Sequence, residues 1–113
     1  MVLVGRGGVD SDVDPDRCWG LAPLSPSDAR EMVQELRSFG ALTARRGRPE
    51  ADLDQLADLI ARVSRLMATV PEVAEIDLNP VLARADSALA VDVRIRVRRA
   101  PAPQLLDHVR HLR

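Results

Sequence analysis

The chain has 113 residues and a mass of 12.4 kDa, which is about the size of one globular domain. Its apolar share of 46% and its charged share of 29% exclude a disordered acidic tail and a membrane span. The 16 basic residues against 17 acidic ones leave a formal net charge of -1, so the basic excess of a general nucleic-acid-binding protein is absent and no nucleic-acid partner is expected.

Lysine is missing from the sequence, and all basic residues are arginines. This excludes Schiff-base chemistry, a lysine general base and the phosphate-binding lysine of a P-loop within this chain. Cys18 is the single cysteine, so neither a disulfide framework nor a cysteine zinc site is expected, and a reducing compartment is favoured. The N-terminal apolar run is too short for a signal peptide, and no run reaches membrane-spanning length. We therefore expect a cytoplasmic protein without membrane contact.

The N-terminal part alternates short apolar runs with turn residues. Residues 2–4 are strand-like and end at the glycine-rich turn 5–8. Residues 10–16 are acidic and typical of a loop, since Pro15 stops a strand. Residues 21–24 are interpreted as a short edge strand.

Two helices follow. The first is predicted over about residues 26–38, with Ser25 or Ser27 as its cap and Gly40 just past its end. The second is predicted over about residues 53–69, with Asp52 as its cap. Its apolar residues step by three and four along one face: Leu53, Leu56, Ile60, Val63 and Met67. This face is expected to be core, and a docking face for a missing partner is the alternative.

Alternating strands complete the pattern. Residues 73–78 alternate apolar and acidic side chains, Asn79-Pro80 forces a bend, residues 81–83 resume the strand, and a second alternating strand spans about 88–97. Two such strands joined by a short turn predict an antiparallel hairpin. The apolar residues of the hairpin are expected to pack against the second helix: Ile76, Leu78, Val91 and Val93. The order indicates an α+β domain with helices packed on one face of a mainly antiparallel sheet.

The hairpin carries the candidate site. Asp77 and Asn79 lie two residues apart, so on a strand both side chains leave one face. Asp92, on the return strand, is expected opposite this pair. Two carboxylates and one amide oxygen are hard ligands that suit Mg²⁺, which fills its shell with water and nucleotide phosphates. An ordinary solvated sheet face is the alternative. The arginines at 94, 96, 98 and 99 are expected to contact phosphate or CoA. Arg94 and Arg96 share one strand face, so a solvated basic edge that blocks sheet addition is the alternative.

The motifs resemble a known family. Residues 71–80, PEVAEIDLNP, and residues 90–95, AVDVRI, resemble the end of the ATP-grasp module of ADP-forming acyl-CoA and acetyl-CoA synthetases, which are related to the succinyl-CoA synthetase beta subunit. The family pattern there is roughly PEIxELDINPL, a short hairpin and a VDARI-like strand. The upstream segments GRGG at 5–8, LAPL at 21–24 and RGRP at 46–49 also match, in order. The resemblance implies the second ATP-grasp subdomain over residues 1–98, with a tail over 99–113.

The resemblance also implies roles for single residues. Asn79 and Asp92 fall on positions that hold the Mg²⁺ of Mg-ATP in related succinyl-CoA synthetases, and Asp77 falls on an acidic position facing the same nucleotide site. Asp12 falls where the family usually has a glutamate, which makes it a candidate for nucleotide binding with a shorter reach. Gly20 falls where the family commonly has an arginine, so a phosphate or structural contact is lost there.

An ATP-grasp fold holds nucleotide between two α+β subdomains, and this chain resembles only the second. The resemblance therefore implies the part of an ADP-forming acyl-CoA (acetate–CoA) ligase that binds Mg²⁺ and ATP or ADP, inactive alone. Its partners would be the missing ATP-grasp half and a CoA-binding subunit or domain, with ATP and acyl-CoA as ligands of the assembled enzyme. The alternative is a non-catalytic or regulatory ATP-grasp-derived interaction domain, as in acetyltransferase fusions.

Overall fold

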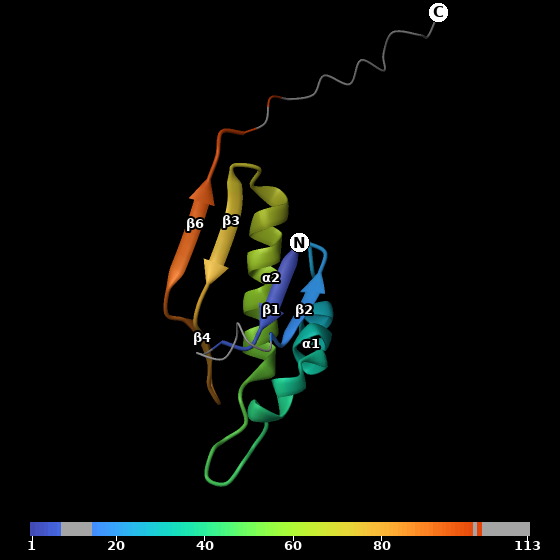
Figure 1. Ribbon diagram of the computed structural model, residues 1–113, viewed down its shortest axis with the longest axis vertical. Coiled ribbons are helices and arrows are strands. Elements are labelled where there is room, and N and C mark those ends of the chain that lie inside the picture. The colour runs from blue at the N-terminus through green and yellow to red at the C-terminus, as the bar shows by residue number, and fades with distance from the viewer. Residues whose placement is uncertain (8–14, 101, 103–113) are drawn as a thin grey trace, which may run out of the picture.

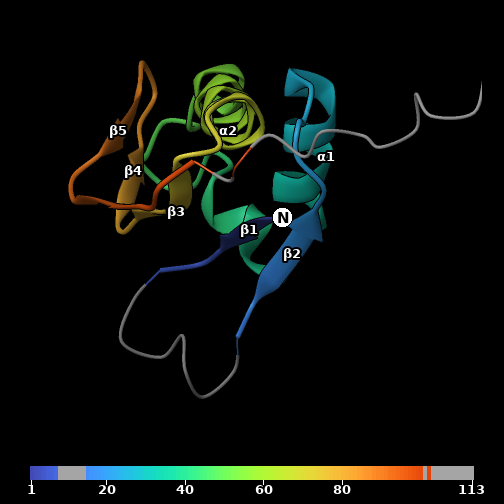
Figure 2. The same ribbon diagram turned by 90° about the horizontal axis from the view of Figure 1, so that it is seen from above.

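The computed structural model describes residues 1–7, 15–100 and 102. Its helices are α1 (Pro26–Glu35) and α2 (Leu53–Thr69), and a short 3-10 helix, η1, spans Arg37–Ala41. Its strands are β1 (Val2–Gly5), β2 (Arg17–Gly20), β3 (Val73–Leu78), β4 (Val81–Ala83), β5 (Ala88–Ala90) and β6 (Val93–Val97). The two helices lie side by side, and the strand pairs pack against them (Figures 1 and 2). The predicted α+β class, with helices packed on antiparallel sheet, is confirmed.

The strands form antiparallel pairs, β1 with β2, β3 with β6 and β4 with β5. The expected single strand over 88–97 is divided, because residues 91–92 leave the ladder opposite Asn79-Pro80. Proline has no N–H to donate, so the regular pairing cannot continue through it. Two bonds still bridge the bend: the Asn79 N–H donates to the Asp92 carbonyl at 3.1 Å, and the Val91 N–H donates to the Pro80 carbonyl at 3.0 Å. The chain therefore passes from one strand pair into the next without separating.

The predicted edge strand at residues 21–24 is wrong, since the strand in this region is β2, four residues earlier. Pro23 cannot donate to a ladder. The Leu24 N–H instead donates to the Ser64 hydroxyl of α2 at 2.9 Å. This bond fixes the segment before α1 to the middle of α2.

The start of α1 follows the predicted cap. The Ser25 hydroxyl accepts from the Asp28 N–H, and the Asp28 carboxylate accepts from the Ser25 N–H, both at 3.0 Å. These bonds satisfy backbone donors that a helix start leaves free. The helix ends at Glu35, earlier than expected, because Leu36 adopts an extended conformation (φ -62, ψ 134) before η1 begins.

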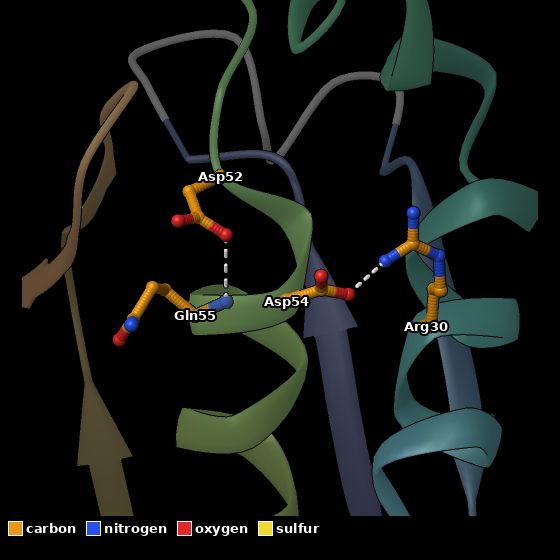
Figure 3. A network of polar contacts seen from close by, with 4 residues as sticks. All are labelled: Arg30, Asp52, Asp54 and Gln55. Atoms are coloured by element: carbon orange, nitrogen blue, oxygen red, sulfur yellow. Dashed lines mark hydrogen bonds and ion pairs between the residues drawn. The ribbon is translucent and has the colours of Figure 1, made fainter.

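At the start of α2 the Asp52 carboxylate accepts from the Gln55 N–H at 3.0 Å, as its predicted role as a cap requires (Figure 3). The neighbouring Asp54 forms an ion pair with Arg30 of α1. The helix ends at Thr69, before the proline that was expected to stop it. Local signals thus place both ends of α2 correctly.

The buried core lies mainly between the two helices. Its apolar members are Ala29, Met32, Val33, Leu36, Ala51, Leu53, Ala57, Ala61 and Val73. Alanines at 57 and 61 let the helices approach closely. Ser64, which is fully buried, donates its hydroxyl to the Ala61 carbonyl at 2.8 Å and so has its polar group satisfied.

Only Leu53 of the apolar stripe of α2 belongs to the buried core that the spacing suggested. Leu56, Ile60 and Val63 are only half-buried, because α1 packs on the neighbouring flank of the helix. The expected packing on Val91 and Val93 is also wrong, since these side chains are 57% and 49% exposed. The stripe therefore has part of its surface without a partner in the described residues.

Asp16 connects the N-terminal strands to η1. Its two carboxylate oxygens accept the backbone N–H groups of Arg37 and Ser38 at 2.9 and 2.8 Å. Hydrogen bonds from Ser38, together with those from the Arg37 backbone and its charge, hold the pKa of Asp16 below its ordinary value.

The lowered pKa predicts an acid-sensitive contribution to stability. The Asp16 carboxyl group binds its proton less tightly in the folded chain than in the unfolded chain. Its stabilising effect is therefore present above the unfolded pKa of about 3.9 and is lost as pH falls through the folded pKa. Asp16→Asn should be less stable than wild type at neutral pH, and this deficit should shrink below about pH 4. Urea unfolding at neutral and acid pH measures the stability deficit of Asp16→Asn. Asp58→Asn is the control, because the Asp58 side chain is exposed. An equal deficit at both pH values would contradict the prediction.

Candidate functional site

The alternation of β3 separates a helix-facing side from an outward side. Ala74, Ile76 and Leu78 are half-buried toward α2, while Glu75 and Asp77 are exposed. Because successive strand residues point to opposite faces, Asp77 lies on the side of the sheet away from the helix. Exposed Asn79 follows directly after the strand, where the chain bends. The Asn79–Pro80 peptide bond is cis.

Asp92 lies beside Asn79. In the β3–β6 ladder Asp77 is opposite Arg94 and Leu78 is opposite Val93. One step further, the Asn79 N–H donates to the Asp92 carbonyl at 3.1 Å. The expectation that Asp92 comes opposite the Asp77 and Asn79 pair is thus met by the backbone.

Arginines of β6 interleave with these acidic groups. Arg96 contacts the Glu75 carboxylate at 3.0 Å, and Arg94 Nε lies 3.6 Å from Asp92 Oδ2. The sequence left these arginines as phosphate contacts or a basic edge, and their pairing with carboxylates was not foreseen. Such exposed pairs contribute little to stability. The Asp92 carboxylate, beside Arg94, is 56% exposed and accessible to a cation.

The side-chain oxygens of Asp77, Asn79 and Asp92 fit a cation whose remaining ligands are water and phosphate oxygens. Within residues 1–7, 15–100 and 102, no group of three or more His, Cys, Asp or Glu side chains is placed to hold a metal ion. Two carboxylates and one amide oxygen are hard donors that suit Mg²⁺, whose shell is usually completed by water and phosphates. These residues therefore fit a shared Mg²⁺–nucleotide site better than a cation site made by protein alone.

The other candidates are less informative. Asp12 lies outside the described residues. Gly20 ends β2 against α1, and a Cβ there would lie 2.6 Å from the Met32 sulfur, so a larger side chain would require Met32 to move. The Cys18 thiol donates to the Glu35 carboxylate at 3.0 Å, and this bond raises the pKa of Cys18 above its ordinary value. A raised pKa makes the thiol a poor nucleophile.

The part of the chain that the structure describes contains no helix with the length and apolar character needed to cross a membrane.

Comparisons with known proteins agree on one family. The family model described as the ATP-grasp domain matches residues 1–97. The beta subunit of ADP-forming acetate–CoA ligase I of Pyrococcus furiosus is 38% identical over 94 residues, covering 83% of this chain and 40% of the relative. ADP-forming acetate–CoA ligase I of Archaeoglobus fulgidus is 41% identical over 95 residues, covering 84% of this chain and 14% of the relative.

A solved structure matches the fold as well. The dinucleotide-forming acetyl-coenzyme A synthetase 1 of Ca. Korarchaeum cryptofilum, in complex with coenzyme A and Mg-AMPPCP, superposes with a TM-score of 0.78 at 37% identity. The match covers 85% of this chain and 45% of that chain. The chain belongs to the ATP-grasp domain family, and its resemblance to the ATP-grasp segment of ADP-forming acetyl-CoA synthetases is confirmed. It spans less than half the length of these relatives.

Proposed function

We propose that this chain is the Mg-ATP-facing part of an ADP-forming acyl-CoA ligase. In this proposal Asn79 and Asp92 bind the Mg²⁺ of Mg-ATP, and Asp77 faces the same nucleotide. The observation that carries it is the backbone bond between Asn79 and Asp92 at the end of β3, on a chain of the ATP-grasp family. The nucleotide analogue with magnesium in the Korarchaeum relative supports the choice of ligand.

Each residue has a defined task. The Asp92 carboxylate and the Asn79 amide oxygen supply hard ligands, and Arg94 Nε lies 3.6 Å from the Asp92 carboxylate. The exposed Asp77 adds negative charge to the same side of the sheet and attracts the cation. When bound, Mg²⁺ supplies charge neutralisation on the transferring phosphoryl group. The strand pairing keeps Asn79 and Asp92 in register while nucleotide binds.

The rest of the enzyme is supplied by partners. We infer that the other ATP-grasp half and a CoA-binding subunit or domain complete the catalytic site, since this chain spans 40% of its Pyrococcus relative. The absence of any lysine supports this, because the chain has no lysine ammonium to place on phosphate. The chain alone is therefore inactive.

Reconstitution tests the proposal. This chain is mixed with the part of the Pyrococcus beta subunit that it does not match and with a CoA-binding subunit or domain, and acetyl-CoA formation from acetate, CoA and ATP is measured. We expect no product from the chain alone and product from the mixture. A stable complex without turnover would favour the alternative of a non-catalytic interaction domain.

Binding of Mg²⁺ to the isolated chain is expected to be weak. Mg²⁺ loses its water reluctantly and here finds only two carboxylates and an amide before nucleotide phosphates arrive. Titration calorimetry with MgCl₂ should show millimolar or weaker binding, and Asp92→Asn should weaken it further. Tight binding that is unchanged in Asp92→Asn would place the cation elsewhere.

A further inference from the structure

A groove separates the two main strand pairs. It has a volume of about 900 Å³ and is bordered by β1 on one side and β3 on the other. Its floor is formed by apolar side chains of α2: Leu56, Leu59, Ile60, Val63 and Met67. These side chains are only half-buried, so the groove presents apolar surface that the described residues leave partly uncovered.

Both walls of the groove are edge strands. β1 pairs with β2 and β3 pairs with β6, and no described strand pairs with the second edge of either. Such an edge carries backbone N–H and C=O groups that can accept a further strand. Two free edges facing one groove are suited to a strand that pairs on both sides.

The strand directions restrict what fits. In Figure 1 the arrows of β1 and β3 point the same way, while those of β2 and β6 point the opposite way. A single strand that runs against both β1 and β3 would join the two pairs into one antiparallel sheet. Two inserted strands could not make every pair antiparallel, because β1 and β3 run in the same direction. One strand is therefore the favoured number.

We propose that the groove binds one β-strand supplied by the portion of the ATP-grasp domain that this chain lacks. The proposal rests on the proposed function and names the contact through which the missing half assembles. The family match supports a strand from this source. The match covers only 40% of the Pyrococcus beta subunit, so that protein has further residues beyond the matched region. A second copy of this chain is the competing occupant.

The inserted strand has a defined pattern. It spans about five or six residues, since β1 has 4 residues and β3 has 6. Alternate side chains are apolar and cover Ile60 and Val63 on the groove floor. The other side chains emerge on the outward side of the sheet, beside Asp77. The strand thereby ties the missing half directly to the proposed nucleotide site.

Overlapping synthetic peptides test this contact without nucleotide or metal. The peptides tile the part of the Pyrococcus beta subunit that this chain does not match, and amide hydrogen exchange of this chain is measured with each. One peptide should slow exchange in both β1 and β3 by at least about ten-fold, because new backbone hydrogen bonds protect both edges. Protection of neither edge by any peptide would overturn the proposal.

A matched pair of variants locates the contact. Ile60→Asp places a charge on the groove floor, whereas Leu66→Asp places one on α2 outside the groove, at a side chain already 39% exposed. Peptide affinity should fall at least about ten-fold in Ile60→Asp and stay near wild type in Leu66→Asp. Circular dichroism verifies that both variants fold. If Ile60→Asp does not fold, the amide hydrogen exchange of the wild-type chain with each peptide decides the question. Equal losses in both variants would contradict the proposal.

Two further outcomes separate this inference from the proposed function. Protection of β1 and β3 that rises with the concentration of this chain alone would assign the groove to a second copy. An assembled enzyme that is fully active with Ile60→Asp would overturn strand insertion and leave the proposed function intact. Asp92→Asn should bind the peptide as wild type does, because it lies outside the groove.

Discussion

Asp92→Asn is expected to abolish acyl-CoA synthesis by the reconstituted enzyme while leaving the chain folded. The substitution removes the negative charge of a proposed Mg²⁺ ligand and keeps the side-chain size. Loss of a group that merely orients a metal ligand costs roughly 10–100-fold, so loss of a ligand charge should cost at least about 100-fold in kcat. The carboxylate is 56% exposed and paired only at 3.6 Å, so stability should change little.

The control for this experiment is Asp86→Asn. Asp86 is exposed in the turn between β4 and β5, where it accepts a hydrogen bond from the Ser87 hydroxyl at 3.1 Å. Its removal changes the net charge equally and should leave acetyl-CoA formation near wild type. Thermal unfolding verifies that both variants remain folded. An assembled complex that tolerates Asp92→Asn would show that the metal is not held there.

Met32→Ala is expected to have a large effect on stability. Met32 of α1 is 6% exposed, and its sulfur lies against the end of β2, where Gly20 allows close approach. Truncating a buried methionine costs about 2–5 kcal/mol, because the cavity left behind collapses only in part. That is a large share of the ~5–15 kcal/mol that stabilises a typical domain.

Ile60→Ala provides the contrast. Ile60 is only half-buried on the groove floor, so its truncation should cost about 1 kcal/mol or less in the isolated chain. If Ile60 belonged to the core, as its spacing in α2 suggests, Ile60→Ala would lower the free energy of unfolding by about 2–5 kcal/mol, as for other buried side chains. Urea unfolding of both variants, fitted with a common slope, measures the difference. Equal losses would mean that the α2 stripe is already covered in the isolated chain.

Much of the local structure could be predicted from the sequence. Ser25 and Asp52 marked the helix starts, because short polar side chains satisfy the free N–H groups there. Alternation over residues 73–78 predicted β3 with the correct inward and outward sides. The Asp77–Asn79 spacing and the return strand also placed Asp92 beside Asn79. Each of these signals acts over a few residues, so no distant contact was needed to interpret them.

The sequence by itself determined the two helices with their starts, the strand β3 and the outward face that carries Asp77. Only the tertiary structure decided which flank of α2 is buried. The strongest apolar stripe pointed to Ile60, yet α1 packs beside Ala57 and Ala61, whose small side chains allow close helix approach. Periodicity shows that a helix has an apolar face, but the choice of partner depends on segments far apart in the chain. For the same reason the pairing of Arg94 with Asp92 emerged only from the folded arrangement, as did the edges of β1 and β3 that no described strand covers.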